Sequence, residues 1–150
     1  MNDHEKLVAN TAQFFTLHWG VCSDIPQWDF SWQWCNAVPN YQLGGVYALF
    51  SGDTLQYVGL GSSVGGGIYK DHGISRRLLA HVLKSAPADA SVSYEAQDRW
   101  KALQVDLVAT IGFPTEYSYL ASALEDYLIG RLSPPENRLK RQFAPAVAGN

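Results

Sequence analysis

The sequence of 150 residues predicts an α+β fold, in which a small, mainly antiparallel sheet is flanked by helices. Two short apolar segments, residues 46–50 and 55–59, are separated by the turn signal Ser51-Gly52-Asp53-Thr54, which is typical of a hairpin. Residues 105–111 alternate in hydrophobicity, as a third strand does. Three longer segments carry apolar residues at helical spacing. A chain of this length suffices for a single domain with one core.

Residues 1–43 are expected to form an N-terminal extension that packs on this core. Residues 3–19 predict a helix, and residues 27–34 alternate strictly between aromatic and polar side chains, which predicts a half-buried strand. We expect its aromatic stripe to belong to the core; the alternative is a platform that stacks nucleic-acid bases. One side of the helix carries Leu7, Thr11, Phe14, Phe15 and His18, and the stripe consists of Trp28, Phe30, Trp32 and Trp34.

The register of the hairpin decides which side chains share a face of the sheet. A loop of three residues, 51–53, places Tyr47 directly opposite Tyr57. A loop of two or four residues places the two tyrosines on opposite faces, because side chains alternate along a strand. The function considered below needs both phenols on one face, so the three-residue loop is the expected one.

The helix predicted over residues 74–84 follows a glycine-rich loop, residues 61–73. Arg77 and His81 are four positions apart, so they lie one above the other at the edge of its apolar stripe. From an edge position both side chains can reach a groove. A guanidinium suits the charge that develops on a phosphoryl group, and His81 could transfer protons. Residues 94–103 are a further candidate helix.

The last helix, predicted over residues 116–132, ends before two consecutive prolines. Glu125 falls inside its apolar stripe, whereas Asp126 points to solvent. A carboxylate on a buried face is costly unless it is paired or binds a metal. Two interpretations stay open: Glu125 binds a divalent cation, or it forms a salt bridge with Arg77 or Arg131 inside the core.

These residues, taken in order along the chain, resemble the GIY-YIG nucleases, metal-dependent enzymes that hydrolyse nucleic-acid phosphodiesters. The resemblance covers residues 44–141, which we expect to form the nuclease-like domain, followed by a C-terminal tail, residues 142–150. It rests on spacing more than on sequence identity. The matching parts are Gly45-Val46-Tyr47, Tyr57-Val58-Gly59, Arg77, His81, Glu125 and Asn137, which follows Glu125 by twelve positions.

The resemblance implies a role for each residue. Glu125 would bind the single divalent metal ion, Mg²⁺ or Mn²⁺, while Arg77 and His81 belong to the catalytic helix. Tyr57 contributes to the phosphate site, and Tyr47 helps to activate the attacking water. A phenol has a pKa of about 10 and is a poor base at neutral pH. Tyr47 therefore either aligns the water or acts as a base in surroundings that lower its pKa.

Two departures from the family pattern concern substrate binding. Leu60 stands where the family often has lysine, and twenty positions separate Tyr57 from Arg77. The inserted loop resembles those of restriction-type members. Asn137 either anchors the segment after the last helix or contacts the substrate backbone. The candidates for substrate contacts are Asn137, Lys70, Tyr69, His72, Arg76 and Arg138.

The net charge of −3 disfavours a nucleic-acid enzyme at first sight, but the charge is unevenly distributed. Residues 69–84 contain four basic side chains and one acidic one, as do residues 131–141, so each cluster carries +3. The remainder, with 3 basic and 12 acidic residues, carries −9. One side of an acidic protein could thus attract a phosphate backbone. The acidic remainder hints at limited affinity or at a protein partner.

The chain contains no apolar run long enough to span a membrane, and its start lacks the pattern of a secretory signal. Cys22 and Cys35 are too few and too far apart for a redox or zinc motif, which predicts two buried thiols in a reducing cytoplasm. Together with this expectation, the resemblance implies a cytoplasmic, metal-dependent endonuclease acting on DNA. It would be of restriction or defence type, either a homodimer or guided by a protein partner.

Two other functions remain open. One is a catalytically silent module of the same fold that binds nucleic acid or a protein. The other is a small-molecule enzyme that uses the glycine-rich loop, residues 61–73, to bind a nucleotide. The glycine spacing disfavours the latter, because it fits neither Gly-x-Gly-x-x-Gly nor the phosphate loop of ATPases.

Overall fold

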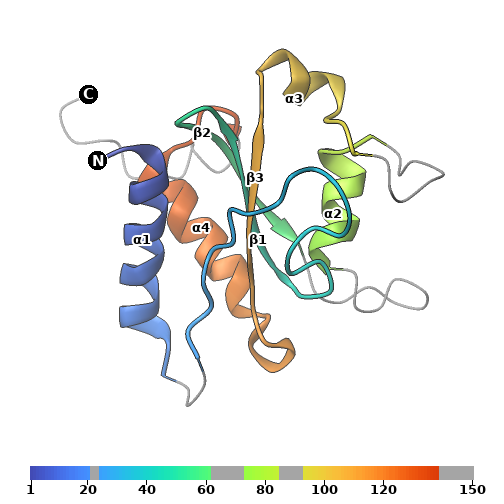
Figure 1. Cartoon of the computed structure of the whole chain (residues 1–150). Coiled ribbons are helices and arrows are strands. Elements are labelled where there is room, and N and C mark those ends of the chain that lie inside the picture. The colour runs from blue at the N-terminus through green and yellow to red at the C-terminus, as the bar shows by residue number, and fades with distance from the viewer. Residues whose placement is uncertain (21–23, 62–72, 85–92, 139–150) are drawn as a thin grey trace.

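The computed structural model describes residues 1–20, 24–61, 73–84 and 93–138 (Figure 1). Within these residues, three strands form one antiparallel sheet in the order β2-β1-β3, with helices on both faces. This confirms the predicted α+β class. The elements are α1 (Asp3–His18), β1 (Gly45–Ser51), β2 (Thr54–Gly61), α2 (Gly73–His81), α3 (Asp98–Ala102), β3 (Leu107–Gly112), the 3₁₀ turn η2 (Thr115–Tyr117) and α4 (Leu120–Leu132).

The sheet separates two hydrophobic layers. Alternate residues of β1, among them Val46, Ala48 and Phe50, pack with the apolar side chains of α1 and α4. The residues between them, Tyr47 and Leu49, pack with α2 and α3 on the other face. Figure 1 shows α1 and α4 together on one side of the sheet and α2 on the other. Alternation along β1 thus assigns each side chain to one layer.

Helix α1 begins at a capping box, which satisfies two backbone N–H groups at its N-terminus. The Asn2 side chain accepts a hydrogen bond from Glu5 N at 2.9 Å, and the Glu5 carboxylate accepts one from Asn2 N at 3.3 Å. The predicted apolar side is confirmed except at its end, where His18 is exposed. The buried residues are Leu7, Thr11, Phe14 and Phe15.

The strand predicted over residues 27–34 is wrong. In the described part of the chain, this segment pairs with β3 at one bridge. There Asp29 N donates to Thr110 O at 2.8 Å, and Thr110 N donates to Asp29 O at 3.1 Å. The aromatic stripe does not share a face. Its first two members pack on the α1/α4 layer, whereas Trp32 is buried in the α2/α3 layer and stacks on Trp34 at 5.3 Å. Trp34 has a φ of 65°, which a strand does not allow.

The hairpin loop contains two residues, Gly52 and Asp53, and not the predicted three. Ser51 pairs with Thr54 across the turn. Gly52 has a φ of 57°, and a positive φ is what a type II′ turn needs at its first central position.

A loop of two residues alone would place Tyr47 and Tyr57 on opposite faces of the sheet, but a β-bulge in β2 restores their common face. Phe50 pairs with Leu55, and the next pair joins Leu49 to Tyr57, so Gln56 falls between the two pairs. The extra residue shifts the alternation of β2 by one position. Tyr57 therefore lies on the same face as Tyr47 and Leu49, although the loop has an even number of residues.

The helices are shorter than predicted. Helix α2 ends at His81, and the chain then forms a bridge between Leu83 and Ala96, so the candidate helix 94–103 is reduced to α3. Helix α4 starts at Leu120 rather than at residue 116, after the turn η2. Its end is as predicted, because Ser133 adopts a left-handed conformation ahead of the two prolines.

The prediction of two buried thiols is wrong at Cys35, which is only half-buried; Cys22 lies outside the described residues.

Among the helices in the described part of the chain, none combines the length and the apolar character that crossing a membrane requires.

Candidate active site

The candidate site is centred on two tyrosines of the hairpin. The ring centroids of Tyr47 and Tyr57 lie 6.1 Å apart on the face of the sheet that α2 covers. Tyr47 is 1% exposed, and Tyr57 is half-buried. Gly59, the residue paired with Tyr47 in the register of β1 and β2, leaves room for its phenol ring. Backbone pairing and a missing side chain thus direct the Tyr47 phenol across β2.

Arg77 reaches this pair from α2. Its guanidinium donates a hydrogen bond to the phenol oxygen of Tyr47, although the arginine side chain itself is exposed. The leucine that follows Arg77, Leu78, is fully buried and holds this turn of α2 against the sheet. An arginine at the edge of the buried stripe can therefore touch a buried phenol and solvent at once. This is the arrangement that the sequence predicts.

Glu125 lies on α4, the helix that packs on the opposite face of the sheet, and its charge still acts on the same phenol. It is 6% exposed and lies among the buried leucines of that helix, while Asp126 is exposed. The predicted orientation of the two carboxylates is confirmed. The charge of Glu125 acts on Tyr47, so α2 and α4 contribute opposite charges to one phenol. The alternative partner Arg131 places its guanidinium 4.8 Å from the centre of the Tyr127 ring.

The surroundings keep Tyr47 protonated. Burial is the largest cause that raises the pKa of Tyr47 above its usual value, and the neighbouring Tyr57 and Glu125 raise it further. The charge and the hydrogen bond of Arg77 act in the opposite direction but are outweighed. In this environment Tyr47 is a neutral phenol at pH 7, which can orient a water molecule. A tyrosine base with a lowered pKa does not agree with these surroundings.

His81 ends α2 one turn after Arg77. Its side chain is exposed, and partial desolvation together with the positive charge of Arg77 lowers its pKa from the usual value of a histidine. The imidazole is therefore neutral at pH 7 and can accept a proton. The backbone carbonyl of His81 accepts a hydrogen bond from Trp100 Nε1 at 2.8 Å, which joins the end of α2 to α3.

A single hydrated divalent cation suits this set of side chains better than a closed metal cage. Within the described residues, no three His, Cys, Asp or Glu side chains group together as a metal site would need. Mg²⁺ keeps several waters and is commonly held by one or two carboxylates together with substrate phosphate. Glu125, a buried carboxylate whose charge acts on the Tyr47 phenol, fits that requirement.

Asn137 anchors the segment after α4 to β2. Its Oδ1 accepts a hydrogen bond from Val58 N at 2.8 Å, and its Nδ2 donates one to Val58 O at 2.7 Å. The side chain is 7% exposed, and Glu136 N adds a bond to Gln56 O at 3.0 Å. The segment after α4 therefore closes the free edge of β2. Of the two roles expected for Asn137, the structural one agrees with this geometry.

The structure describes two of the remaining substrate candidates, Arg76 and Arg138. Arg76 and Arg138 are exposed, on α2 and after α4 respectively. Leu60 packs against the α1/α4 layer, so a lysine at this position of β2 would start from the face opposite to Tyr57. Tyr69, Lys70 and His72 lie outside the described residues.

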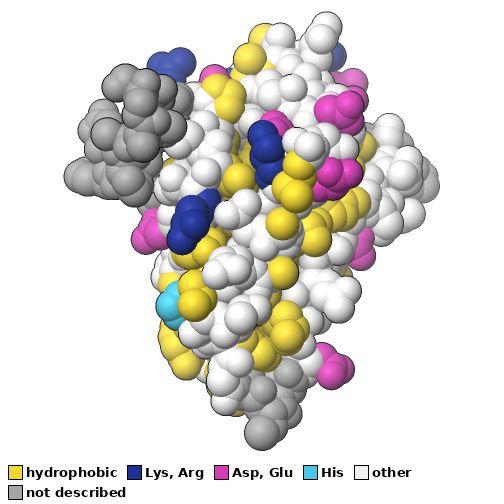
Figure 2. Space-filling view, turned by 90° about the vertical axis from the view of Figure 1, so that its left-hand side faces the viewer, with side chains coloured by type: hydrophobic (Ala, Val, Ile, Leu, Met, Phe, Trp, Pro, Cys, Tyr) yellow, Lys and Arg dark blue, Asp and Glu magenta, His cyan; other side chains and the backbone are white. Residues whose placement is uncertain are grey.

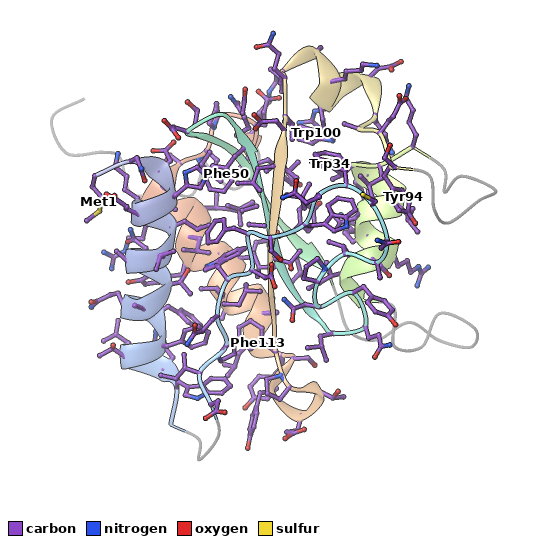
Figure 3. All side chains as sticks on the ribbon, viewed as in Figure 1. Met1, Trp34, Phe50, Tyr94, Trp100 and Phe113 are labelled. Atoms are coloured by element: carbon purple, nitrogen blue, oxygen red, sulfur yellow. The ribbon has the colours of Figure 1, made fainter. Side chains whose placement is uncertain are left out.

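Two residues of α3 belong to the site although no sequence pattern points to them. Trp100, labelled in Figure 3, is 1% exposed. Its ring lies 5.2 Å from that of Tyr57. The Arg99 guanidinium lies 4.2 Å from the centre of the Trp100 ring and 6.0 Å from that of Tyr57. Neither belongs to a recognisable motif. An Arg-Trp pair in a basic helical segment is a signal too common to single out a site.

Comparison with protein-family models, with curated proteins and with solved structures gave no match to this chain. The functional interpretation rests on the residues and on their arrangement.

Proposed function

We propose that this protein is a divalent-metal-dependent endonuclease that hydrolyses phosphodiester bonds of DNA. One observation carries the proposal: Arg77 of α2 and Glu125 of α4, 48 positions apart in the sequence, act on the same buried phenol, Tyr47, next to Tyr57. A guanidinium and a carboxylate that both act on one of two neighbouring phenols suit the hydrolysis of an anionic ester. The same four residues are among those that carry the resemblance to the GIY-YIG nucleases.

Each side chain has a chemical task in this proposal. Arg77 binds the non-bridging oxygens of the phosphate and stabilises the charge that grows on them in the transition state. Tyr57 donates a hydrogen bond to the same phosphate. Tyr47, kept neutral by burial, orients the attacking water through its phenol oxygen. His81, neutral at pH 7, accepts the proton that the water loses.

Glu125 would hold the metal ion, Mg²⁺ or Mn²⁺. When bound, such an ion polarises the phosphoryl group and lowers the pKa of bound water. The burial of Glu125 serves this role, because a carboxylate with little access to water binds a cation more strongly than an exposed one.

The setting of the activity is part of the proposal. The net charge of −3 limits the attraction to DNA, so a second copy of the chain or a protein partner would supply further contacts. Figure 2 shows that the face formed by α1 presents basic, acidic and hydrophobic side chains side by side, with no continuous basic surface among the described residues there. We place the enzyme in the cytoplasm, in a restriction or defence role.

The second candidate is a catalytically silent module that binds nucleic acid or a protein. The observation that favours it is the burial of Tyr47, which is 1% exposed and so has little access to water. A silent module would keep the basic residues but would not need the carboxylate at position 125.

Nicking of supercoiled plasmid separates the two candidates. The wild type, Glu125→Gln and Asp126→Asn are incubated with plasmid and Mg²⁺ or Mn²⁺. Glu125→Gln keeps the shape of the side chain but removes its charge; Asp126→Asn makes the same change one position away, at an exposed residue. The proposal predicts nicking by the wild type and by Asp126→Asn, and loss in Glu125→Gln. Equal background from all three proteins would favour the silent module.

A further inference from the structure

Arg99 occupies an unusually well-defined position for a surface arginine. Its guanidinium lies over the Trp100 ring at 4.2 Å, and that ring is fixed by burial and by the hydrogen bond from Nε1 to His81 O. The other neighbour is Tyr57, whose ring centre is 6.0 Å from the guanidinium carbon. Tyr57 also contacts Tyr47, so the Tyr57 ring neighbours both Arg99 and the centre of the candidate site.

Glu136 orients the guanidinium of Arg99. Arg99 Nη2 lies 3.4 Å from Glu136 Oε1, and Glu136 is itself fixed because its backbone N donates to Gln56 O. The side chain of Arg99 remains 55% exposed, whereas that of Glu136 is 16% exposed. A guanidinium has five N–H donors, and the contact with Glu136 uses a single nitrogen. The group is therefore oriented and still accessible from solvent.

We propose that Arg99 forms a second phosphate-binding subsite, which takes a backbone phosphate adjacent to the one that Arg77 and Tyr57 bind. The inference rests on the proposed function for its ligand class, a nucleic-acid strand. A planar guanidinium that stacks on an aromatic ring suits phosphate, because it loses little freedom on binding and offers paired donors. Tyr57 then neighbours both phosphate sites, the one at Arg77 and the one at Arg99.

A purely structural role for Arg99 is the competing explanation, in which the arginine only ties α3 to the segment that closes β2. The two roles predict opposite effects of Glu136→Gln. If Arg99 serves structure, this substitution breaks the same contact as Arg99→Ala and has the same effect on DNA. If Arg99 binds phosphate, Glu136→Gln removes a competing negative charge, and DNA binds as well as before or more tightly.

The test is the affinity for a short labelled DNA duplex, measured by fluorescence anisotropy in EDTA over a range of salt concentrations. Omitting the metal separates binding from cleavage. We expect Arg99→Ala to weaken binding about tenfold and to reduce the slope of log K against log salt by about 0.9, as for one lost phosphate contact. Arg99→Lys keeps the slope, since it keeps the charge, but binds less tightly than wild type because it cannot stack.

Lys101→Ala is the matched control, because it removes one exposed positive charge from the same helix. It should leave the affinity near that of the wild type. The inference is overturned if Arg99→Ala binds like the wild type, if Lys101→Ala weakens binding equally, or if Glu136→Gln reproduces the loss. Plasmid nicking tests the proposed function separately. If DNA binding depends on Arg99 but no nicking occurs, the phosphate-binding subsite is supported and the proposed hydrolase activity is contradicted.

Discussion

The phenol ring of Tyr47 occupies the space that a side chain on Gly59 would need. A Cβ atom added to Gly59 would overlap with Tyr47 Cζ and with its phenol oxygen. The two residues are partners in the register of β1 and β2, and Tyr47 is almost completely buried. The glycine is therefore required by packing, and it decides where the phenol points.

Gly59→Ala should destabilise the protein and displace the Tyr47 ring. The added methyl group overpacks a buried position, which typically costs about 1–3 kcal/mol in the free energy of unfolding. Urea denaturation measures the change. Gly130→Ala is the control, because a methyl group there would meet nothing within 4 Å and alanine favours a helix by about 0.5–1 kcal/mol. A Gly59→Ala protein as stable as the wild type would show that Tyr47 does not lie over Gly59.

Asn137→Ala should destabilise the protein more than the loss of a surface amide would. The substitution removes both partners of the Val58 backbone, N–H and C=O, at a buried position. Each unsatisfied buried group costs about 1–3 kcal/mol, so we expect a loss of at least about 2 kcal/mol in the free energy of unfolding. Arg138→Ala, an exposed neighbour, should change stability little. Equal stabilities for the two variants would contradict the anchoring role.

The pH dependence of activity should report on His81. Desolvation and the charge of Arg77 lower its pKa from the usual value of a histidine, so the neutral, proton-accepting form prevails at pH 7. Activity should fall as the pH drops through that lowered pKa, because protonated His81 can no longer accept a proton. Titration of the imidazole by NMR gives the pKa directly. Arg77→Gln, which removes the nearby positive charge, should raise the pKa of His81. An unchanged pKa would show that the charge of Arg77 does not act on His81.

Divalent cations should stabilise the wild type through Glu125. A cation that binds only the folded state adds RT ln(1 + [L]/Kd), or about 1.4 kcal/mol at ten times Kd. We expect Mg²⁺ or Mn²⁺ to raise the Tm of the wild type and of Asp126→Asn, and to leave that of Glu125→Gln unchanged. If the metal raised the Tm of all three proteins equally, the ion would bind at a site that does not include Glu125.

Sequence patterns predicted the orientation of Glu125 well, because helical periodicity over several turns determines which residues of α4 face the core. Whether the hairpin loop has an odd or an even number of residues was not predictable in the same way. The assumed three-residue loop was wrong, and the bulge at Gln56 restored the common face of Tyr47 and Tyr57. A local pattern does not reveal an extra residue, because the bulge depends on how two strands pair.

Long-range contacts explain the other misses. The alternation of residues 27–34 resembles a strand, but pairing with β3 is limited to Asp29, and the aromatic side chains fill two layers instead of one. The role of Asn137 depends on its meeting Val58 across 79 positions of sequence. Arg99 reaches Tyr57 only because Trp100 packs against the end of α2. These relationships arise from tertiary packing, which overrides local propensity.

The most direct test of the site is the single-turnover rate of DNA cleavage, measured with Mn²⁺ for Arg77→Gln, Glu125→Gln and the double variant. Residues that act on one phosphate as a unit have non-additive effects. We predict that each single substitution lowers the rate by at least about 10²-fold, and that the double variant is no slower than the slower single one. Wild-type cleavage that persists in Glu125→Gln, or strictly multiplicative losses in the double variant, would contradict a shared site.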